Sequence, residues 1–329
     1  MTELLWLSLL LIPISALLSH AFGEGMKRAS FGQQIRLYGP TLHATKRGTP
    51  TMGGIVILLL WGVSLLLSRW AQGLSEQSVF ILSAGVTCGL IGLLDDLLAQ
   101  RRRRSLGLSP LQKVFLVTLA SVMLFFVFPQ VFHVPLRVPF SSLTFALPST
   151  FLRFLLCWAV FTATTNSMNL TDGLDGLAAG VTLLILIGFL VLSPQATLLP
   201  LLPLVGILGG FLWVNAYPAQ LFLGDVGSFA LGGVVAATAL ATGTALILPL
   251  LAGLLVLEMG SVLLQVTCYR LTRRRIFKMS PFHHHFEQTG EIDSPYLLPK
   301  LEWPEPQITI RLWILQGFFV GLGILVIRI

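Results

Sequence analysis

Acidic side chains that could bind a metal ion or transfer a proton lie beside apolar runs at two points of the chain. Asp95 and Asp96 are adjacent at the end of one run, and Asp225 lies between glycines just before another. Mg²⁺ is usually bound by one or two carboxylates together with substrate phosphates, so Asp225 is a candidate Mg²⁺ ligand. Adjacent helical residues point about 100° apart, so Asp95 and Asp96 need not share a role. Phe222, three residues before Asp225, could stack on a base.

A third polar stretch has an amide or acid at every third residue. Its members are Asn166, Asn169, Asp172 and Asp175, and Gly173 lies among them. A helical backbone would gather the four side chains, and Asn169 or Asp172 could cap a new helix. Because a helix N-terminus attracts anions and glycine permits close approach of a ligand, the stretch is a predicted binding site.

Two loops add basic groups to these acids. His283, His284 and His285 are adjacent in the last long loop. Three adjacent imidazoles cannot all bind one metal ion in favourable geometry, so we expect them to donate to a diphosphate. The Gly- and Pro-rich loop 46–54 carries Lys46 at a basic tip, and it is not a Walker A motif because no Gly-Lys-Ser/Thr follows.

Together these residues favour one kind of chemistry. Acids, Mg²⁺, a basic loop and imidazoles suit phosphoryl transfer from a soluble diphosphate to a lipid acceptor, with a carboxylate positioning the acceptor. The sequence shows no Ser or Cys constellation for nucleophilic catalysis. A transporter or lipid flippase is the alternative class, but it predicts ionisable residues near the membrane midplane and often repeated halves, and no repeat is present.

Helices in a membrane must position these residues. Of the 329 residues, 55% are hydrophobic and 11% are charged, whereas a soluble domain carries about 25% charged residues. The composition therefore excludes a soluble fold and disorder. Because a span takes about 20 residues, we predict an all-α integral membrane protein in which residues 1–329 form one domain with about ten transmembrane helices. The predicted spans are 3–23, 53–70, 78–97, 111–130, 150–165, 173–193, 196–214, 227–247, 249–270 and 308–328.

The distribution of charge predicts the orientation of the spans. Lys and Arg gather in the connections after the first, third and ninth spans, which places both termini in the periplasm and five loops in the cytoplasm. Asn215 and the candidate residues above then meet at the cytoplasmic face and form one site. Residues 134–147 are predicted to form a small periplasmic β-hairpin. Glu258 lies inside the ninth span, so that span is either irregular or faces the protein interior.

The motifs and their order resemble one family. The matching segments are Gly48 to Gly54, Asp95-Asp96, Asn166 to Gly176, Phe222 to Ser228 and Phe277 to Glu287. The chain resembles the phospho-N-acetylmuramoyl-pentapeptide transferases (the MraY family), within the polyprenyl-phosphate N-acetylhexosamine-1-phosphate transferase superfamily. The resemblance implies a homodimer in the bacterial cytoplasmic membrane that uses Mg²⁺ and converts UDP-MurNAc-pentapeptide and undecaprenyl phosphate to lipid I and UMP. It implies membrane lipid as the surroundings and no nucleic-acid partner.

The resemblance also implies roles for individual residues. Asp225 resembles the metal ligand, and Asp95 and Asp96 resemble the pair that activates the lipid phosphate, with the base unassigned between them. His284 and His285 resemble residues on the diphosphate side and complete the candidate catalytic set. The candidate substrate-binding residues are Lys46, Asn166, Asn169, Asp172, Gly173, Asp175, Asn215, Phe222 and His283.

One position departs from the family pattern. Where the family reads Asp-Asp-x-x-Lys, this chain has Ala99 in place of the lysine. Arg101–Arg104 or Lys113 could supply the positive charge instead. The nearest rival function is that of a sister enzyme, which transfers GlcNAc-1-phosphate from UDP-GlcNAc to the same lipid. The run Met279–Glu287 favours the muramoyl-pentapeptide enzyme, since the sister branch usually carries a differently spaced histidine motif.

Overall fold

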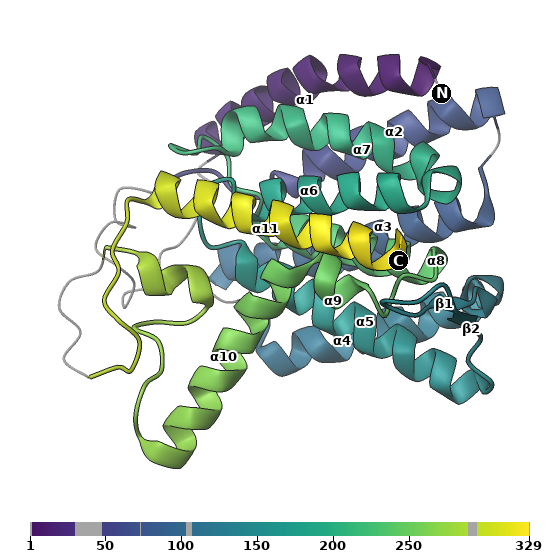
Figure 1. Cartoon of the computed structure of the whole chain (residues 1–329). Helices are drawn as coiled ribbons and strands as arrows, with labels where there is room; N and C mark the ends of the chain where they lie inside the picture. The colour runs from purple at the N-terminus through teal and green to yellow at the C-terminus, as the bar shows by residue number, and fades with distance from the viewer. Residues whose placement is uncertain (1, 30–47, 73, 103–106, 289–294, 329) are drawn as a thin grey trace.

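The computed structural model describes residues 2–29, 48–72, 74–102, 107–288 and 295–328 (Figure 1). These residues form eleven α-helices, two short 3-10 helices and one two-stranded hairpin. The α-helices are α1 (Thr2–Arg28), α2 (Gly54–Gln72), α3 (Glu76–Arg102), α4 (Pro110–Val127), α5 (Thr150–Thr171), α6 (Leu177–Leu192), α7 (Pro194–Asn215), α8 (Gly224–Ala241), α9 (Leu248–Leu251), α10 (Gly253–Thr272) and α11 (Glu305–Arg328). The remaining elements are η2 (Pro129–His133), η3 (Phe282–Phe286), β1 (Leu136–Arg137) and β2 (Thr144–Phe145).

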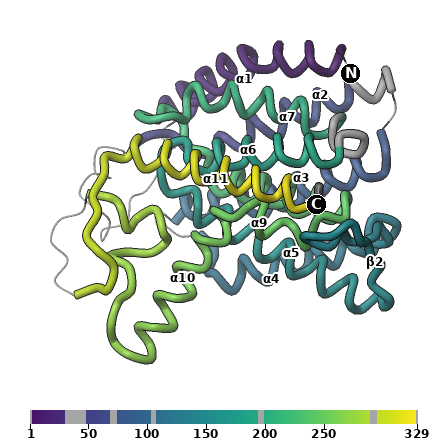
Figure 2. The backbone as a smooth tube through the Cα atoms, viewed as in Figure 1, coloured from purple at the N-terminus to yellow at the C-terminus, as the bar shows by residue number. Residues whose placement is uncertain are grey.

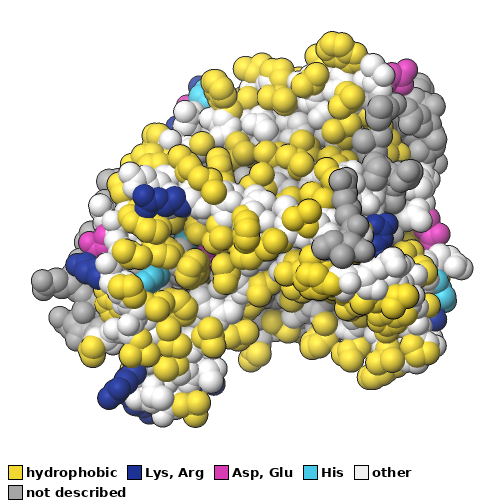
Figure 3. Space-filling view, in the orientation of Figure 1, with side chains coloured by type: hydrophobic (Ala, Val, Ile, Leu, Met, Phe, Trp, Pro, Cys, Tyr) yellow, Lys and Arg dark blue, Asp and Glu magenta, His cyan; other side chains and the backbone are white. Residues whose placement is uncertain are grey.

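The helical membrane fold agrees with the sequence prediction, because each predicted span overlaps an α-helix. Within the described residues, six helices are long and apolar enough to cross a membrane, namely α1, α3, α4, α8, α10 and α11, and α2, α6 and α7 contain shorter apolar stretches. Hydrophobic side chains also dominate the face shown in Figure 3, and Trp213 and Leu271 are 84% and 80% exposed. A surface of this kind suits lipid rather than water. The protein is therefore a multi-pass membrane protein, while the number of crossings and their direction stay predictions.

The two ends of the bundle differ in character. The chain ends marked N and C and the β-hairpin lie at one end, and η3, between α10 and α11, lies at the other (Figures 1 and 2). The predicted hairpin is confirmed, with Leu136 paired to Phe145 and Arg137 to Thr144. Arg137 also ties the hairpin to the bundle, because its backbone N–H donates to Gly243 O at 2.8 Å. This separation puts the hairpin and the histidine-bearing η3 on opposite sides of the hydrophobic core.

The boundary between the eighth and ninth predicted spans was wrong. The eighth span was predicted to run to residue 247, but α8 ends at Ala241 and a short α9 precedes α10. The helix is interrupted at Ala252, and the buried Gln316 side chain of α11 covers this interruption. Its Nε2 donates to Leu251 O at 2.7 Å, and its Oε1 accepts from Leu254 N at 3.2 Å. The side chain thus satisfies backbone groups that would otherwise lie unpaired inside the bundle.

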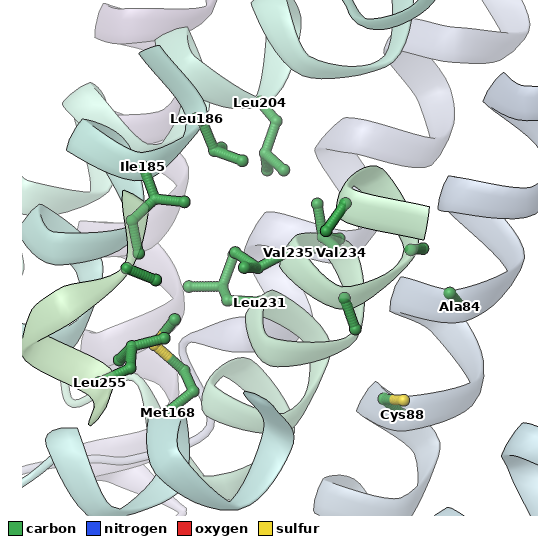
Figure 4. Close-up of a cluster of buried hydrophobic side chains, with 14 of the residues drawn as sticks. Ala84, Cys88, Met168, Ile185, Leu186, Leu204, Leu231, Val234, Val235 and Leu255 are labelled. Atoms are coloured by element: carbon green, nitrogen blue, oxygen red, sulfur yellow. The ribbon is translucent and has the colours of Figure 1, made fainter. Parts of the chain in front are cut away.

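Helix α8 is the central element of the bundle. Every residue from Val226 to Ala241 is buried, and α8 packs against α2, α3, α5 and α6. Figure 4 shows Leu231, Val234 and Val235 of α8 in the middle of a cluster that also draws side chains from α3, α5, α6, α7 and α10. Gly and Ala residues are frequent along α8, and small residues let neighbouring backbones approach closely.

The closest of these approaches lies beside the acids. A Cβ added to Gly92 of α3 would lie 2.0 Å from Asp225 O, so a larger residue would force α3 and α8 apart. We expect Gly92→Ala to lower the free energy of unfolding by about 1–3 kcal/mol, as overpacking of a tight contact does. Thermal unfolding of the purified protein in detergent measures the effect.

Gly62 of α2 is the matched control, because no atom lies within 4 Å of a Cβ added there. Gly62→Ala should be neutral or slightly stabilising, since alanine is the better helix former. Equal unfolding temperatures for the two variants would contradict the close approach of α3 and α8.

Candidate functional site

A cluster of three acids and one lysine lies where α3, α4 and α8 meet. Lys113 Nζ lies 2.7 Å from Asp95 Oδ2 and 2.5 Å from Asp225 Oδ2. The Lys113 and Asp95 side chains are 10% and 6% exposed, and that of Asp225 is 24% exposed. Charges that are shielded from water attract each other more strongly than charges in water. Lys113 is therefore the principal partner of both acids.

The start of α4 is built to aim Lys113 at α3. Ser109 and Gln112 form a capping box, in which Ser109 Oγ accepts from Gln112 N and Gln112 Oε1 accepts from Ser109 N. Just before this cap, Leu108 N donates to the Asp95 carboxylate. The cap starts α4 beside Asp95, and the first turn of the helix then brings Lys113 back to the acids.

Asp96 has a different partner, as expected for adjacent residues on a helix. Its Oδ2 accepts a hydrogen bond from Val226 N at 3.0 Å, in the first turn of α8. Leu223, at the N-cap of α8, forms no capping side-chain bond. The Asp96 carboxylate therefore caps α8 from α3, and a negative charge at a helix N-terminus is favourable.

Asn169 joins the cluster from α5. Its Nδ2 donates to Asp225 Oδ1 at 2.8 Å and to Ser228 Oγ at 3.0 Å. Both oxygens of Asp225 are thus held, one by Asn169 and the other by Lys113. The cluster contains residues from four helices, and these elements are far apart in the sequence.

The rest of the polar stretch behaves differently from the prediction. Asn169 and Asp172 do not cap a new helix, because α5 continues to Thr171 and α6 begins at Leu177. Asp172 is instead the C-cap of α5, and Gly176 occupies the N-cap of α6 with a φ of 73°. The N-terminus of α6 therefore has no side-chain cap. The prediction was wrong about the helix to which Asn169 and Asp172 belong, because both lie at the C-terminal end of α5.

Two of the other side chains in this stretch bond to backbone groups. Asn166 Nδ2 donates to Thr162 O, one turn back in its own helix, at 2.7 Å. Asp175 Oδ2 accepts from Ala219 N at 2.9 Å, in the loop before α8. The side-chain bond from this stretch to the acid cluster comes from Asn169.

The loop before α8 is held by two other segments. Phe222 N donates to Pro50 O, and Gly53 N donates to Phe222 O, each at 2.9 Å. The buried side chain of Asn215, at the end of α7, donates to Leu221 O at 2.9 Å. Phe222 therefore lies beside the N-terminus of α8 and the Gly-rich loop. Lys46, predicted to bind substrate from that loop, lies outside the described residues.

The three histidines of η3 differ in accessibility. The side chains of His283 and His285 are 0% and 2% exposed, whereas that of His284 is 20% exposed. His284 Nδ1 lies 3.0 Å from Glu287 Oε1, which orients the ring. Of the three imidazoles, that of His284 is therefore the one that a bound molecule reaches most readily.

His285 has a structural environment. Its Nδ1 accepts a hydrogen bond from Lys278 N at 3.1 Å, so this nitrogen carries no proton. Burial and the Lys278 ammonium lower the pKa of His285 below its usual value. Lys278 is itself buried and donates to Glu287 O at 2.7 Å and to Glu302 Oε1 at 2.8 Å. These contacts hold the loop that carries η3.

Lys113 is a member of the acid cluster that sequence reasoning found only in part. It was one of several cations that could replace the lysine missing at Ala99, and in the structure it contacts the acids. Arg102 instead donates to Gly107 O at 2.8 Å. Arg103 and Arg104 lie outside the described residues. A charged residue directly after a capping box, inside an apolar helix, was the available signal.

The oxygen donors of the acid cluster are of the kind that binds a hard metal ion. Among the residues that the structure describes, no group of three or more His, Cys, Asp or Glu side chains is arranged to hold one. Mg²⁺ does not require such a group, because it usually binds one or two carboxylates, water and substrate phosphates. Asp225 and the nearby acids are oxygen donors of this kind, so the cluster fits Mg²⁺ held jointly with a phosphate ligand.

The sequence of this chain is similar to those of known proteins. Residues 78–243 match the model for glycosyl transferase family 4, and residues 46–58 match the phospho-N-acetylmuramoyl-pentapeptide-transferase signature 1. Similar proteins include phospho-N-acetylmuramoyl-pentapeptide-transferases from Clostridioides difficile (36% identical, covering 99% of this chain and 98% of the relative) and Rubrobacter xylanophilus (38%, covering 95% and 93%). That of Frankia alni is 37% identical and covers 91% of this chain and 89% of the relative.

The central role of Lys113 yields a stability prediction. Lys113→Met leaves Asp95 and Asp225 without their cation, and removal of one partner of a buried ion pair costs about 3 kcal/mol or more. We therefore expect a marked fall in the thermal unfolding temperature. Lys27→Met is the control, because Lys27 and Glu24 are 46% and 43% exposed and such pairs contribute about 0–1 kcal/mol. Similar unfolding temperatures for the two variants would contradict the role of Lys113.

Proposed function

The chain belongs to the phospho-N-acetylmuramoyl-pentapeptide-transferase family, and we propose that the acid cluster around Lys113 is its reaction centre. The enzyme transfers phospho-MurNAc-pentapeptide from UDP-MurNAc-pentapeptide to undecaprenyl phosphate, giving lipid I and UMP. It is a multi-pass protein of the bacterial cytoplasmic membrane. The observation that carries the assignment of the centre is the meeting of Asp95, Asp225 and Asn169, from three helices, at one buried lysine.

The reaction sets clear demands on such a site. An oxygen of the lipid phosphate attacks the sugar-side phosphorus of the diphosphate, a new P–O bond forms, and the P–O bond to UMP breaks. Both reactants are anionic, so the site must offset negative charge and receive a proton from the lipid phosphate when that group is protonated. Carboxylates that bind a cation, with a lysine and an amide beside them, meet both demands.

Asp225 is the proposed Mg²⁺ ligand. When bound, the ion would offset the charge of the diphosphate and favour departure of UMP. Asn169 and Lys113 hold the two oxygens of Asp225 in place, so the carboxylate is oriented before substrate arrives. Lys113 would also interact favourably with phosphate oxygens next to the cluster.

Asp95 and Asp96 are the proposed acceptor-activating pair. Both lie at the same end of α3, but Asp95 contacts Lys113 and the start of α4, whereas Asp96 caps α8. A carboxylate near the lipid phosphate can take its proton and orient the attacking oxygen. The proposed role therefore concerns the lipid acceptor rather than the nucleotide.

The proposed nucleotide pocket is formed by the loop before α8 and the turn after α5. Phe222 would stack on the base, and the turn from Asp172 to Asp175, with Asn215 nearby, would surround the nucleoside. Lys46 and Asn166 complete the proposed substrate-binding set. His284 is proposed on the diphosphate side because its ring is partly exposed, and His283 and His285 would act there through the loop that they stabilise.

Two further proposals concern the whole molecule. Because the nucleotide substrate is soluble and made inside the cell, the acid cluster would face the cytoplasm, and the hairpin and both termini would face the periplasm. The protein would function as a homodimer in the membrane, as the family resemblance implies.

An assay of the purified protein tests the proposed function. With undecaprenyl phosphate and Mg²⁺, UMP should be released from UDP-MurNAc-pentapeptide and not from UDP-GlcNAc, and removal of Mg²⁺ with EDTA should stop the reaction. Release of UMP from UDP-GlcNAc alone would support the sister enzyme instead. No release from either nucleotide, by protein that unfolds cooperatively, would refute transferase activity.

The roles of the acids yield a kinetic prediction. Asp95→Asn and Asp96→Asn should lower kcat by about a hundredfold or more, because the loss of acid–base catalysis costs that much. The KM for UDP-MurNAc-pentapeptide should change far less, since both acids act on the lipid acceptor. Asp175→Asn is the contrasting variant and should mainly raise KM. Equal effects on kcat and KM in the Asp95 and Asp96 variants would count against an acceptor-activating role.

A further inference from the structure

Glu258 is a charged residue that the reaction centre does not use. It lies in α10, and its side chain and that of His283 in η3 are each 0% exposed. His283 Nδ1 lies 3.0 Å from Glu258 Oε2, and the backbone N–H of His283 is directed at the same oxygen at 3.4 Å. An ionisable residue at this depth is costly and is usually functional. Both alternatives for the predicted ninth span are observed, because it is interrupted at Ala252 and Glu258 faces the protein interior.

The opposite side of the His283 ring contacts the proposed nucleotide pocket. A Cβ added to Gly173 would lie 2.2 Å from His283 Nε2, so the imidazole fills the space that any other side chain at 173 would need. Gly173 belongs to the turn that joins α5 to α6. The ring of His283 therefore lies between Glu258 and this turn.

The same turn is held at a second point. Asp175 N donates to Glu305 Oε1 of α11, and Ala219 N donates to Asp175 Oδ2, each at 2.9 Å. At the other end of the turn, the hydrogen bonds from Asp172 N to Met168 O and from Gly173 N to Thr171 O stay within the end of α5. Contact with His283 supplies the second restraint.

The pair is poorly arranged for stability alone. Glu258 Oε1 and His283 Nε2 are buried and have no hydrogen-bond partner among the described residues. Unpaired buried polar atoms destabilise a fold, and an apolar pair of similar size often packs as well as a buried ion pair. Burial lowers the pKa of His283, but the Glu258 carboxylate outweighs burial, so the pKa lies above its usual value. The carboxylate therefore holds the ring firmly in one orientation.

We propose that Glu258 is a positioning residue for nucleotide binding, which holds the His283 imidazole against Gly173 and so fixes the turn from Asp172 to Asp175. The inference rests on the proposed function, since that turn is the proposed nucleoside pocket. Glu258 touches neither substrate nor the reacting atoms and acts through His283.

Kinetics of two Glu258 variants test the proposal. Glu258→Met removes the acceptor and keeps the length of the side chain, whereas Glu258→Gln keeps an oxygen that can accept from His283. We expect Glu258→Met to raise the KM for UDP-MurNAc-pentapeptide by about tenfold, the loss expected for one charged hydrogen bond, with kcat within about threefold of the wild type. Glu258→Gln should keep KM within about threefold of the wild type.

Two more variants separate positioning from folding. His283→Asn keeps a donor near Glu258 but does not reach Gly173, so KM should rise as in Glu258→Met. Gln316→Met removes another buried polar side chain that bonds to the start of α10, and it should lower the unfolding temperature without changing KM. If Glu258→Met does not fold, His283→Asn decides the question.

Wild-type KM in His283→Asn or in Glu258→Met would overturn the proposal, and so would a KM for Glu258→Gln as high as that for Glu258→Met. The wild-type enzyme is measured in the same assay. If it releases no UMP, the proposed function fails. If it turns over normally while the variants keep its KM, only the role of Glu258 fails.

Discussion

The structure depends on one electrostatic constraint, which is that carboxylates at the edge of an apolar bundle need a cation and hydrogen-bond donors. Removing a charge from water costs several kcal/mol, and an ion pair offsets this only when its remaining polar atoms are also satisfied. Lys113 supplies the cation for Asp95 and Asp225. Leu108 N and the Asn169 amide supply the donors. The proposed reaction centre is therefore also the polar cross-link among α3, α4, α5 and α8.

The apolar part of the bundle is shaped to permit this cross-link. Carboxylate side chains are short, so the acids of α3 and α8 can share a lysine only if the two helix axes come close. Gly92 of α3 and the small residues of α8 allow that distance. Close packing along α8 and convergence of charge at its N-terminus are thus two results of the same sequence feature, a helix rich in Gly and Ala.

The sequence predicted an element correctly where the residues that determine the element lie within it. Apolar runs predicted the helices, and short β-prone runs around Ser141-Ser142 predicted the hairpin, because each signal lies within the element that it predicts. The end of α5 was not predictable in this way. Asn169 and Asp172 resemble helix caps in sequence, but α5 continues through Asn169 and ends at Thr171, and the Asn169 side chain finds its partners in α8. Local sequence patterns cannot predict a hydrogen-bond partner that comes from a distant segment.

The replacement of the family lysine by Ala99 has a structural account of the same kind. Arg102 donates to Gly107 O and Asp95 accepts from Leu108 N, so Gly107 and Leu108 lie along the surface that α3 presents from Asp95 to Arg102. Ala99 is four residues after Asp95 and lies on that same surface. Leu108 brings the start of α4 beside Asp95, and the first turn of α4 carries Lys113 into contact with the acids. The positive charge therefore reaches Asp95 from α4 rather than from position 99, and the sequence pattern can vary while the charge balance at the acids is kept.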